Sequence, residues 1–85
     1  MKRIYYQGRG LEEAASVLFG QKDNFSAEDY RRFDQLELVV QDDGRFSVWG
    51  DRGDKAELLR DTAADPHGIV EHLTPYCCEI RQDDA

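Results

Sequence analysis

Residues 35–50 alternate apolar and polar side chains with a period of two, and this pattern constrains the fold more than any other stretch. Residues two apart on a β-strand point to the same face, so the alternation predicts two strands that each bury one face. Segment 42–44, Asp-Asp-Gly, interrupts the alternation with turn-forming residues. The sequence therefore predicts an antiparallel β-hairpin, with Val39 and Trp49 on the face opposite its apolar stripe. That stripe consists of Leu36, Leu38, Val40, Phe46 and Val48.

The N-terminal part of the chain predicts a strand followed by a helix. Residues 3–7 are rich in β-branched and aromatic side chains, and the Gly-Arg-Gly segment 8–10 then ends the strand in a turn. Over residues 11–19 the apolar side chains recur at helical spacing, and Gly20 supplies a C-terminal stop. The helical stripe consists of Leu11, Ala14, Ala15, Leu18 and Phe19.

Two later segments have the spacing of a helix capping box, in which a Ser or Asp is followed three positions later by an acidic residue. The first begins at Ser26 and predicts a short helix over residues 26–33. The second begins at Asp54 and predicts a longer helix over residues 55–64. Both segments are therefore expected to pack as helices beside the hairpin.

The C-terminal part predicts one more short helix over residues 66–73, ended by Pro75, and a last strand over residues 76–81. The acidic tail, residues 82–85, is expected to fray. The sequence thus predicts a small α+β protein in which residues 1–81 form a single compact domain. Its antiparallel sheet would have about four strands in β-α-β-β-α-β order, the split βαβ plan, with helices covering one face.

The chain carries no apolar run near the roughly 20 residues needed to span a bilayer, and its basic start does not lead into a signal-peptide apolar segment. We therefore expect a soluble, cytoplasmic protein without a membrane partner. Cys77 and Cys78 are adjacent, so a disulfide between them would need a strained peptide. Two free thiols are expected, which is consistent with a reducing compartment.

The same cysteines, with His67 and His72, form the one concentration of soft metal ligands in the sequence. Structural zinc sites usually bring cysteines in pairs two to four residues apart, which this spacing does not match. A cysteine nucleophile with a histidine base would also need an orienting group and an oxyanion site. We expect no metal, no cofactor and no catalytic residue, and a small metal-binding or cysteine-dependent enzyme domain stays the alternative.

The negative charge of the chain is unevenly placed. Residues 11–85 hold all 18 Asp and Glu residues but only eight of the 11 Lys and Arg residues. A domain of this size must leave most carboxylates on its surface, where they create an anionic field. Such a field repels nucleic acid itself and attracts basic proteins. The expected partner is a basic protein that binds nucleic acid.

Small acidic domains without a catalytic motif resemble, in general type, the anti-CRISPR and anti-restriction inhibitors of phages and the immunity proteins that neutralise toxins. The sequence predicts a non-enzymatic binding protein that inhibits a basic nucleic-acid-handling protein, with nucleic-acid mimicry as one mechanism. A dimeric regulatory module, joined through Val39 and Trp49, is a further alternative. The residues expected to contact the partner are Glu37, Asp42, Asp43, Trp49, Asp51, Asp54 and Asp61.

Overall fold

The predicted hairpin forms the centre of the computed structural model, which describes residues 1–19 and 32–82. Strand β2 (Gln35–Val40) pairs antiparallel with β3 (Phe46–Arg52), with Leu38 opposite Val48. In the turn between them Gly44 has φ +88°, a conformation that other residues rarely adopt. The hairpin expected from the alternation is therefore confirmed.

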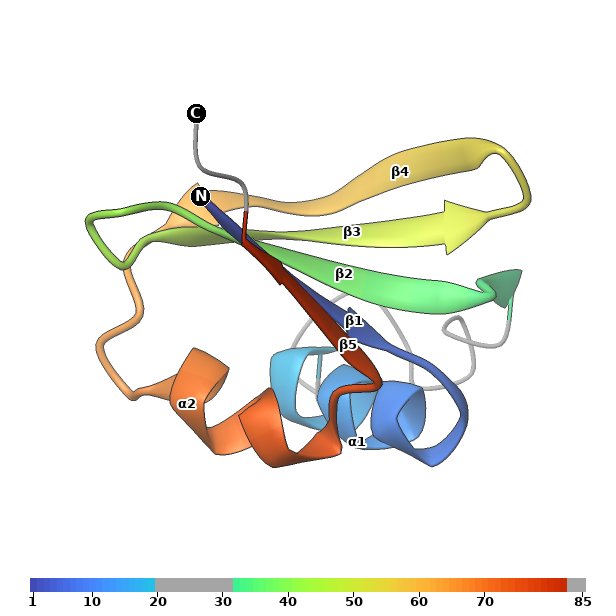
Figure 1. The fold of residues 1–85 in the computed structure, drawn as a ribbon, viewed down its shortest axis with the longest axis horizontal. Helices are drawn as coiled ribbons and strands as arrows, with labels where there is room; N and C mark the ends of the chain where they lie inside the picture. The colour runs from blue at the N-terminus through green and yellow to red at the C-terminus, as the bar shows by residue number, and fades with distance from the viewer. Residues whose placement is uncertain (20–31, 83–85) are drawn as a thin grey trace.

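Three further strands extend this hairpin into a five-stranded sheet (Figure 1). They are β1 (Lys2–Tyr6), β4 (Lys55–Ala63) and β5 (Glu79–Gln82). The strand order is β4-β3-β2-β1-β5, and every neighbouring pair is antiparallel. The two edges of the sheet are thus formed by β4 and β5.

All the described helices lie on one side of the sheet, as Figure 1 shows. They are α1 (Gly8–Phe19), α2 (Ile69–Leu73) and the short 3₁₀ helix η2 (Thr74–Tyr76) that follows α2 directly. In the part of the chain that the structure describes, no helix covers the opposite face. That uncovered face is where the polar side chains of the central strands lie.

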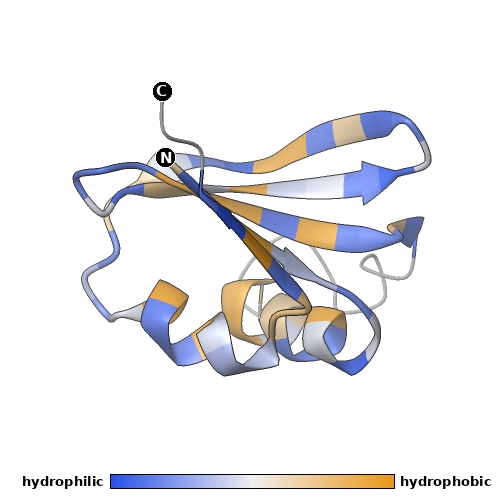
Figure 2. Cartoon of the chain, in the orientation of Figure 1, coloured by the Kyte–Doolittle hydropathy of each residue, from blue (hydrophilic) through white to orange (hydrophobic). Residues whose placement is uncertain are grey.

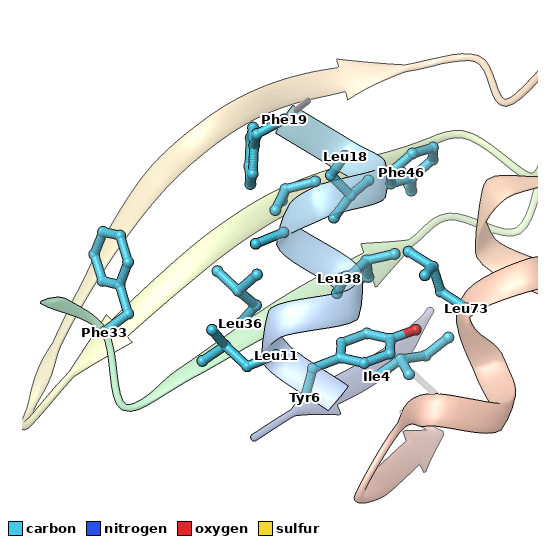
Figure 3. Close-up of a cluster of buried hydrophobic side chains, with 13 residues drawn as sticks. Ile4, Tyr6, Leu11, Leu18, Phe19, Phe33, Leu36, Leu38, Phe46 and Leu73 are labelled. Carbon is cyan, nitrogen blue, oxygen red and sulfur yellow. The ribbon is translucent and has the colours of Figure 1, made fainter. Parts of the chain in front are cut away.

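The core lies between α1 and the inner face of the sheet (Figure 3). The apolar stripe of α1 is fully buried there, as the helical spacing predicted. Hydropathy along the strands alternates between apolar and polar residues in Figure 2, which is the pattern of a sheet buried on one side. The sheet contributes Ile4, Tyr6, Leu36, Leu38, Phe46 and Val48 to this core.

The prediction of a helix over residues 55–64 is wrong, because this segment forms the edge strand β4. Lys, Ala, Glu, Leu and Arg favour helices, but helix propensities are worth less than about 1 kcal/mol per residue. Pairing with β4 satisfies outer backbone groups of β3 from Phe46 to Arg52, with two shifts of register near Val48. On the inner side of the sheet, Arg60 also donates to the carbonyl of Leu18 at 3.3 Å.

A tight turn explains why the chain reverses where a helix was expected to begin. Arg52 pairs with Lys55, so the loop between β3 and β4 has only two residues, Gly53 and Asp54. Gly53 has φ +64°, and Gly at the first position is the preference of a type II′ hairpin turn. A Gly-Asp pair is typical of a hairpin turn. Asp54 is therefore a turn residue and not the helix cap that the sequence predicted.

The sheet consequently has five strands where about four were predicted, and its order is not that of the split βαβ plan, because β1 and β2 pair directly and antiparallel. The α+β class with helices on one face is confirmed. Helix α2 begins at Ile69, later than predicted, because the Asp65 carboxylate accepts hydrogen bonds from the N–H groups of Ile69 (2.7 Å) and Val70 (3.1 Å). The last strand begins only at Glu79. The structure does not describe residues 20–31 and 83–85, where most of the predicted helix 26–33 and of the tail lie.

Gly10 allows η2 to pack closely against the first turn of α1. A Cβ atom at position 10 would overlap the carbonyl oxygen of Tyr76. Since that oxygen belongs to the backbone, it cannot move away as a flexible side chain would. The close approach of α1 and η2 therefore requires glycine at this position.

Replacing Gly10 with Ala should lower the free energy of unfolding by about 1–3 kcal/mol, because the added methyl group overpacks the contact with η2. Helix propensity alone predicts the opposite sign, a gain of about 1 kcal/mol. Urea denaturation measures the difference, with Ser16→Ala on the exposed side of α1 as the control. A Gly10→Ala protein as stable as the wild type would contradict the observed packing.

Candidate binding face

The uncovered face of the sheet carries a row of five side chains, one from each strand. Strand pairing places them side by side, because cross-strand partners lie on the same face. Two of them are almost fully buried although none of the helices in residues 1–19 and 32–82 covers them: Tyr5 is 7% exposed and Glu37 is 9% exposed. Across the sheet the row reads Leu58, Trp49, Glu37, Tyr5 and Glu79.

Tyr5 and Glu37 form the polar centre of this row. Burial, a side-chain hydrogen bond to Glu37 and the charge of that carboxylate all raise the pKa of Tyr5. The Tyr5 hydroxyl therefore stays protonated and donates to the Glu37 carboxylate. A hydrogen bond of this kind offsets part of the cost of burying the Glu37 side chain.

Two arginines lie on the β1–β5 side of Tyr5. The Arg81 guanidinium lies over the Tyr5 ring, 5.4 Å from its centroid, and its Nε is 3.2 Å from the Glu79 carboxylate. A hydrogen bond from Arg3 and the charge of Arg81 both act to lower the pKa of Tyr5, against the larger effects of burial and Glu37. The uncovered face is therefore not uniformly acidic, since cationic side chains occupy this half.

The β2–β3–β4 half of the face holds an open hollow of about 290 Å³. Its carboxylates come from three elements: Glu37 from β2, Asp51 from β3 and Asp54 from the β3–β4 turn. The Gln35 amide donates to Asp51 at 2.6 Å, which orients that carboxylate. Among the described residues of the lining, three are carboxylates and Lys55 is the one cation, so this lining is acidic. The described lining residues are Gln35, Glu37, Asp51, Gly53, Asp54, Lys55 and Ala56.

Trp49 lies between Glu37 and Leu58 in the row and is half-buried. Its indole Nε1 donates to the Ser47 hydroxyl at 3.0 Å, which fixes the orientation of the ring. Leu58, 45% exposed, extends the apolar surface to the edge of the sheet. An aromatic ring beside an acidic hollow is a suitable contact for the alkyl stems and cationic heads of Lys and Arg.

The structure separates the predicted contact residues into two groups. Four of them, Glu37, Trp49, Asp51 and Asp54, lie in or beside the hollow. The other three lie elsewhere: Asp42 and Asp43 are in the hairpin turn, and Asp61 is exposed on β4. The length of β3 separates that turn from the hollow by about 20 Å, at about 3.3 Å per residue.

The turn carboxylates already have partners within the chain. Asp42 lies 3.2 Å from the terminal amino group of Met1, and Asp43 lies 3.8 Å from the Arg45 guanidinium. Both pairs are exposed, so they contribute little to stability and remain open to a competing cation.

The soft ligands do not assemble. Cys77 is half-buried against the core, whereas Cys78 is exposed and its Sγ lies 3.4 Å from the Tyr5 carbonyl oxygen. Both thiols are free, as predicted, although they precede β5 and do not lie within it. His67 lines a separate cavity of about 280 Å³ beside Phe46. Residues 1–19 and 32–82 contain no group of three or more His, Cys, Asp or Glu side chains able to hold a metal ion.

Comparisons with protein-family models, curated proteins and solved structures gave no match. We therefore infer the candidate binding face from the geometry of the structure alone. Within the described ranges, neither α1 nor any other helix has the length and apolar character to cross a membrane.

Sequence reasoning missed the residues that divide this face into two halves. The basic and aromatic members, Arg3, Tyr5 and Arg81, were not among the predicted contacts. A signal was present, because Arg3 and Tyr5 alternate with Ile4 and Tyr6 along β1 and must lie on opposite faces from them. Which of the two faces would remain uncovered depended on where α1 packs.

The two adjacent tyrosines should respond oppositely to removal of their hydroxyl groups. Tyr5→Phe removes the hydrogen bond to Glu37 and should lower the free energy of unfolding by about 1–2 kcal/mol. Among the described residues the buried Tyr6 hydroxyl has no hydrogen-bond partner, so Tyr6→Phe should leave stability unchanged or raise it by about 1 kcal/mol. Urea denaturation at neutral pH compares them, and a less stable Tyr6→Phe protein would refute this difference.

The same pair predicts how stability changes at alkaline pH. Burial is the first cause that raises the pKa of Tyr5 and of Tyr6 above the ordinary value of 10.0, and Tyr6 is shifted further. The unfolded chain then loses these protons first, so stability is complete below about pH 10 and falls as the pH rises further. Tyr6→Phe should flatten that fall more than Tyr5→Phe; equal slopes in chemical denaturation between pH 9 and 12 would contradict this.

Proposed function

We propose that this protein is a non-enzymatic binding protein that inhibits a basic, nucleic-acid-handling protein, and that it docks through the uncovered sheet face. The observation that carries the proposal is the meeting of Glu37, Asp51 and Asp54 around one hollow beside Trp49. Phage anti-CRISPR and anti-restriction inhibitors are the functional class to which such a protein would belong.

The sign of the charge selects the partner. The chain has a formal net charge of -7, and the hollow adds a local concentration of carboxylates on a rigid sheet. Phosphate groups are repelled from such a surface, whereas Lys and Arg side chains are attracted to it. A protein that neutralises a nucleic-acid backbone presents these side chains on one surface. Nucleic acid itself is therefore not the proposed ligand.

The uncovered face is too small to form a stable interface by itself, which indicates that residues around its rim also contact the partner. Five strands about 4.8 Å apart and about 20 Å long give a projected area of about 400 Å². Stable protein interfaces bury about 800 Å² on each partner. Contacts must therefore extend beyond the row of Trp49 and Glu37. We place the hairpin-turn carboxylates Asp42 and Asp43, together with Asp61 on β4, at that rim.

Inhibition would follow because this protein occupies the groove in which the partner binds nucleic acid. A basic groove that holds this acidic face cannot hold nucleic acid at the same time, for both steric and electrostatic reasons. Association would be fast at low ionic strength and would weaken with salt, because exposed charges are screened. Trp49 would supply an aromatic anchor that salt does not screen.

The proposed site of action is the cytoplasm, where nucleic-acid-handling proteins work. The two free thiols, Cys77 and Cys78, are compatible with its reducing conditions.

An affinity pull-down from bacterial lysate tests the proposal, with the bound proteins identified by mass spectrometry at low and at high salt. We expect one basic nucleic-acid-binding protein or complex to be enriched and to be released by salt. The purified partner should then lose its nucleic acid on addition of this protein. Enrichment of no such partner, or a partner that still binds nucleic acid in the complex, would reject inhibition.

Two matched double variants locate the contact. Asp51→Asn with Asp54→Asn removes two charges at the hollow, and Asp42→Asn with Asp43→Asn removes two at the hairpin turn. Asn keeps the shape and the acceptor oxygen of Asp, so the fold is retained. The hollow variant should weaken binding of the captured partner at least about tenfold, and the turn variant should weaken it about two- to threefold. Equal losses would mean that total charge matters and that the hollow does not.

A further inference from the structure

Strand β5 forms a short and open edge of the sheet. Among the described residues it pairs only with β1, and all four of its residues are exposed. Exposed strand edges invite pairing with another strand, and proteins usually interrupt or cover them. The opposite edge follows this rule, because β4 shows two shifts of register against β3 that break its regular pairing. The described part of β5 shows no such irregularity between Glu79 and Gln82.

The hydrogen-bonding direction along β5 follows from one contact. The Cys78 N–H donates to the Tyr5 carbonyl at 2.9 Å, so the backbone polar groups of Tyr5 point toward β5. Direction alternates along a strand, and therefore Arg3 and Tyr5 bond with their register partners Arg81 and Glu79. The N–H and C=O groups of Ile80 and Gln82 consequently point away from the sheet.

The side chains of β5 are complementary to a second copy of the same strand. If two β5 strands pair antiparallel about a two-fold axis at Ile80, each Glu79 lies opposite Arg81 of the other copy. Opposite charges at cross-strand positions stabilise pairing. The outward N–H and C=O groups of the two Ile80 residues would bond to each other. A two-fold contact of this kind is closed and ends at two copies.

Exposed apolar surface lies at the same edge. Ile80 is opposite Ile4 and so lies on the helix side of the sheet, yet it is 46% exposed. Tyr76, in the turn of η2 that leads to β5, is 44% exposed. Pairing about Ile80 would bring the two Ile80 side chains together and bury part of this surface.

We infer that β5 is a self-association edge, and that its occupant is β5 of a second copy in antiparallel register about Ile80. The resulting dimer has a continuous ten-stranded sheet with β5 strands at its centre. In this dimer the uncovered faces of the two copies form one continuous surface. The two acidic hollows lie toward opposite ends of the ten-stranded sheet. This inference does not depend on the proposed inhibitory function.

Molar mass in solution tests the pairing, measured by light scattering under reducing conditions so that no disulfide contributes. Because only residues 79–81 of each β5 pair, we expect a concentration-dependent mass that rises from 9.8 kDa toward twice that value as the protein approaches about 1 mM. A mass that stays at 9.8 kDa over the whole range would overturn the inference.

Two charge variants determine the register. Arg81→Glu places two acidic residues opposite each other at both ends of the paired segment, and Glu79→Arg places two basic residues there. Each variant alone should raise the dimer dissociation constant about tenfold or more. A mixture of the two should restore the wild-type constant, because every cross-strand pair is again opposite in charge. The folded state of each variant is checked by circular dichroism.

Restoration in the mixture distinguishes contacts between copies from contacts within one chain, since each variant alone has lost its own Glu79–Arg81 pair. A dimer that neither variant weakens would refute pairing through β5. If Trp49→Ala instead abolishes that dimer, the copies associate through the uncovered face and the β5 inference fails. Leu58→Asp on the opposite edge is the matched control and should leave the dimer unchanged.

Discussion

The whole structure depends on the burial of one face of β1, β2 and β3 against the apolar stripe of α1. Alternation along these strands gives each an apolar side, and α1 covers that side with residues at helical spacing. In so small a domain this single contact layer provides most of the stabilising apolar burial. Once α1 packs on one face, the side chains of the other face lie beside one another, and no other helix in the described part of the chain covers them.

The uncovered face is itself organised, although no helix of the described residues packs on it. A buried hydrogen bond between Tyr5 and Glu37 marks its centre, with arginines toward β5 and carboxylates toward β4. This separation of charge comes from strand order, because residues distant in the sequence become neighbours across the sheet. The same strand order leaves β5 at one edge of the sheet. The proposed self-association edge and the acidic hollow therefore lie on opposite halves of the sheet.

Strand β4 is the element whose structure differs most from the sequence prediction, which gave a helix over residues 55–64. Residues with high helix propensity were placed in a strand because β3 needed a partner for its outer backbone groups. Local preference amounts to tenths of a kcal/mol per residue, whereas a ladder of backbone hydrogen bonds and cross-strand contacts acts cooperatively. Gly53 favours the strand over the helix locally, because its positive φ allows the two-residue turn that brings β4 beside β3.

The sequence by itself determined the hairpin, the first strand, helix α1 and the two free thiols, because periodicity and neighbouring residues act over short range. It also placed Glu37, Trp49, Asp51 and Asp54 among the candidate contacts, from charge and aromatic character alone. Only the tertiary structure decided that these four lie together and that Asp42, Asp43 and Asp61 lie apart from the hollow. Strand order and the packing side of α1 set those positions, and both arise from long-range pairing that no local pattern encodes.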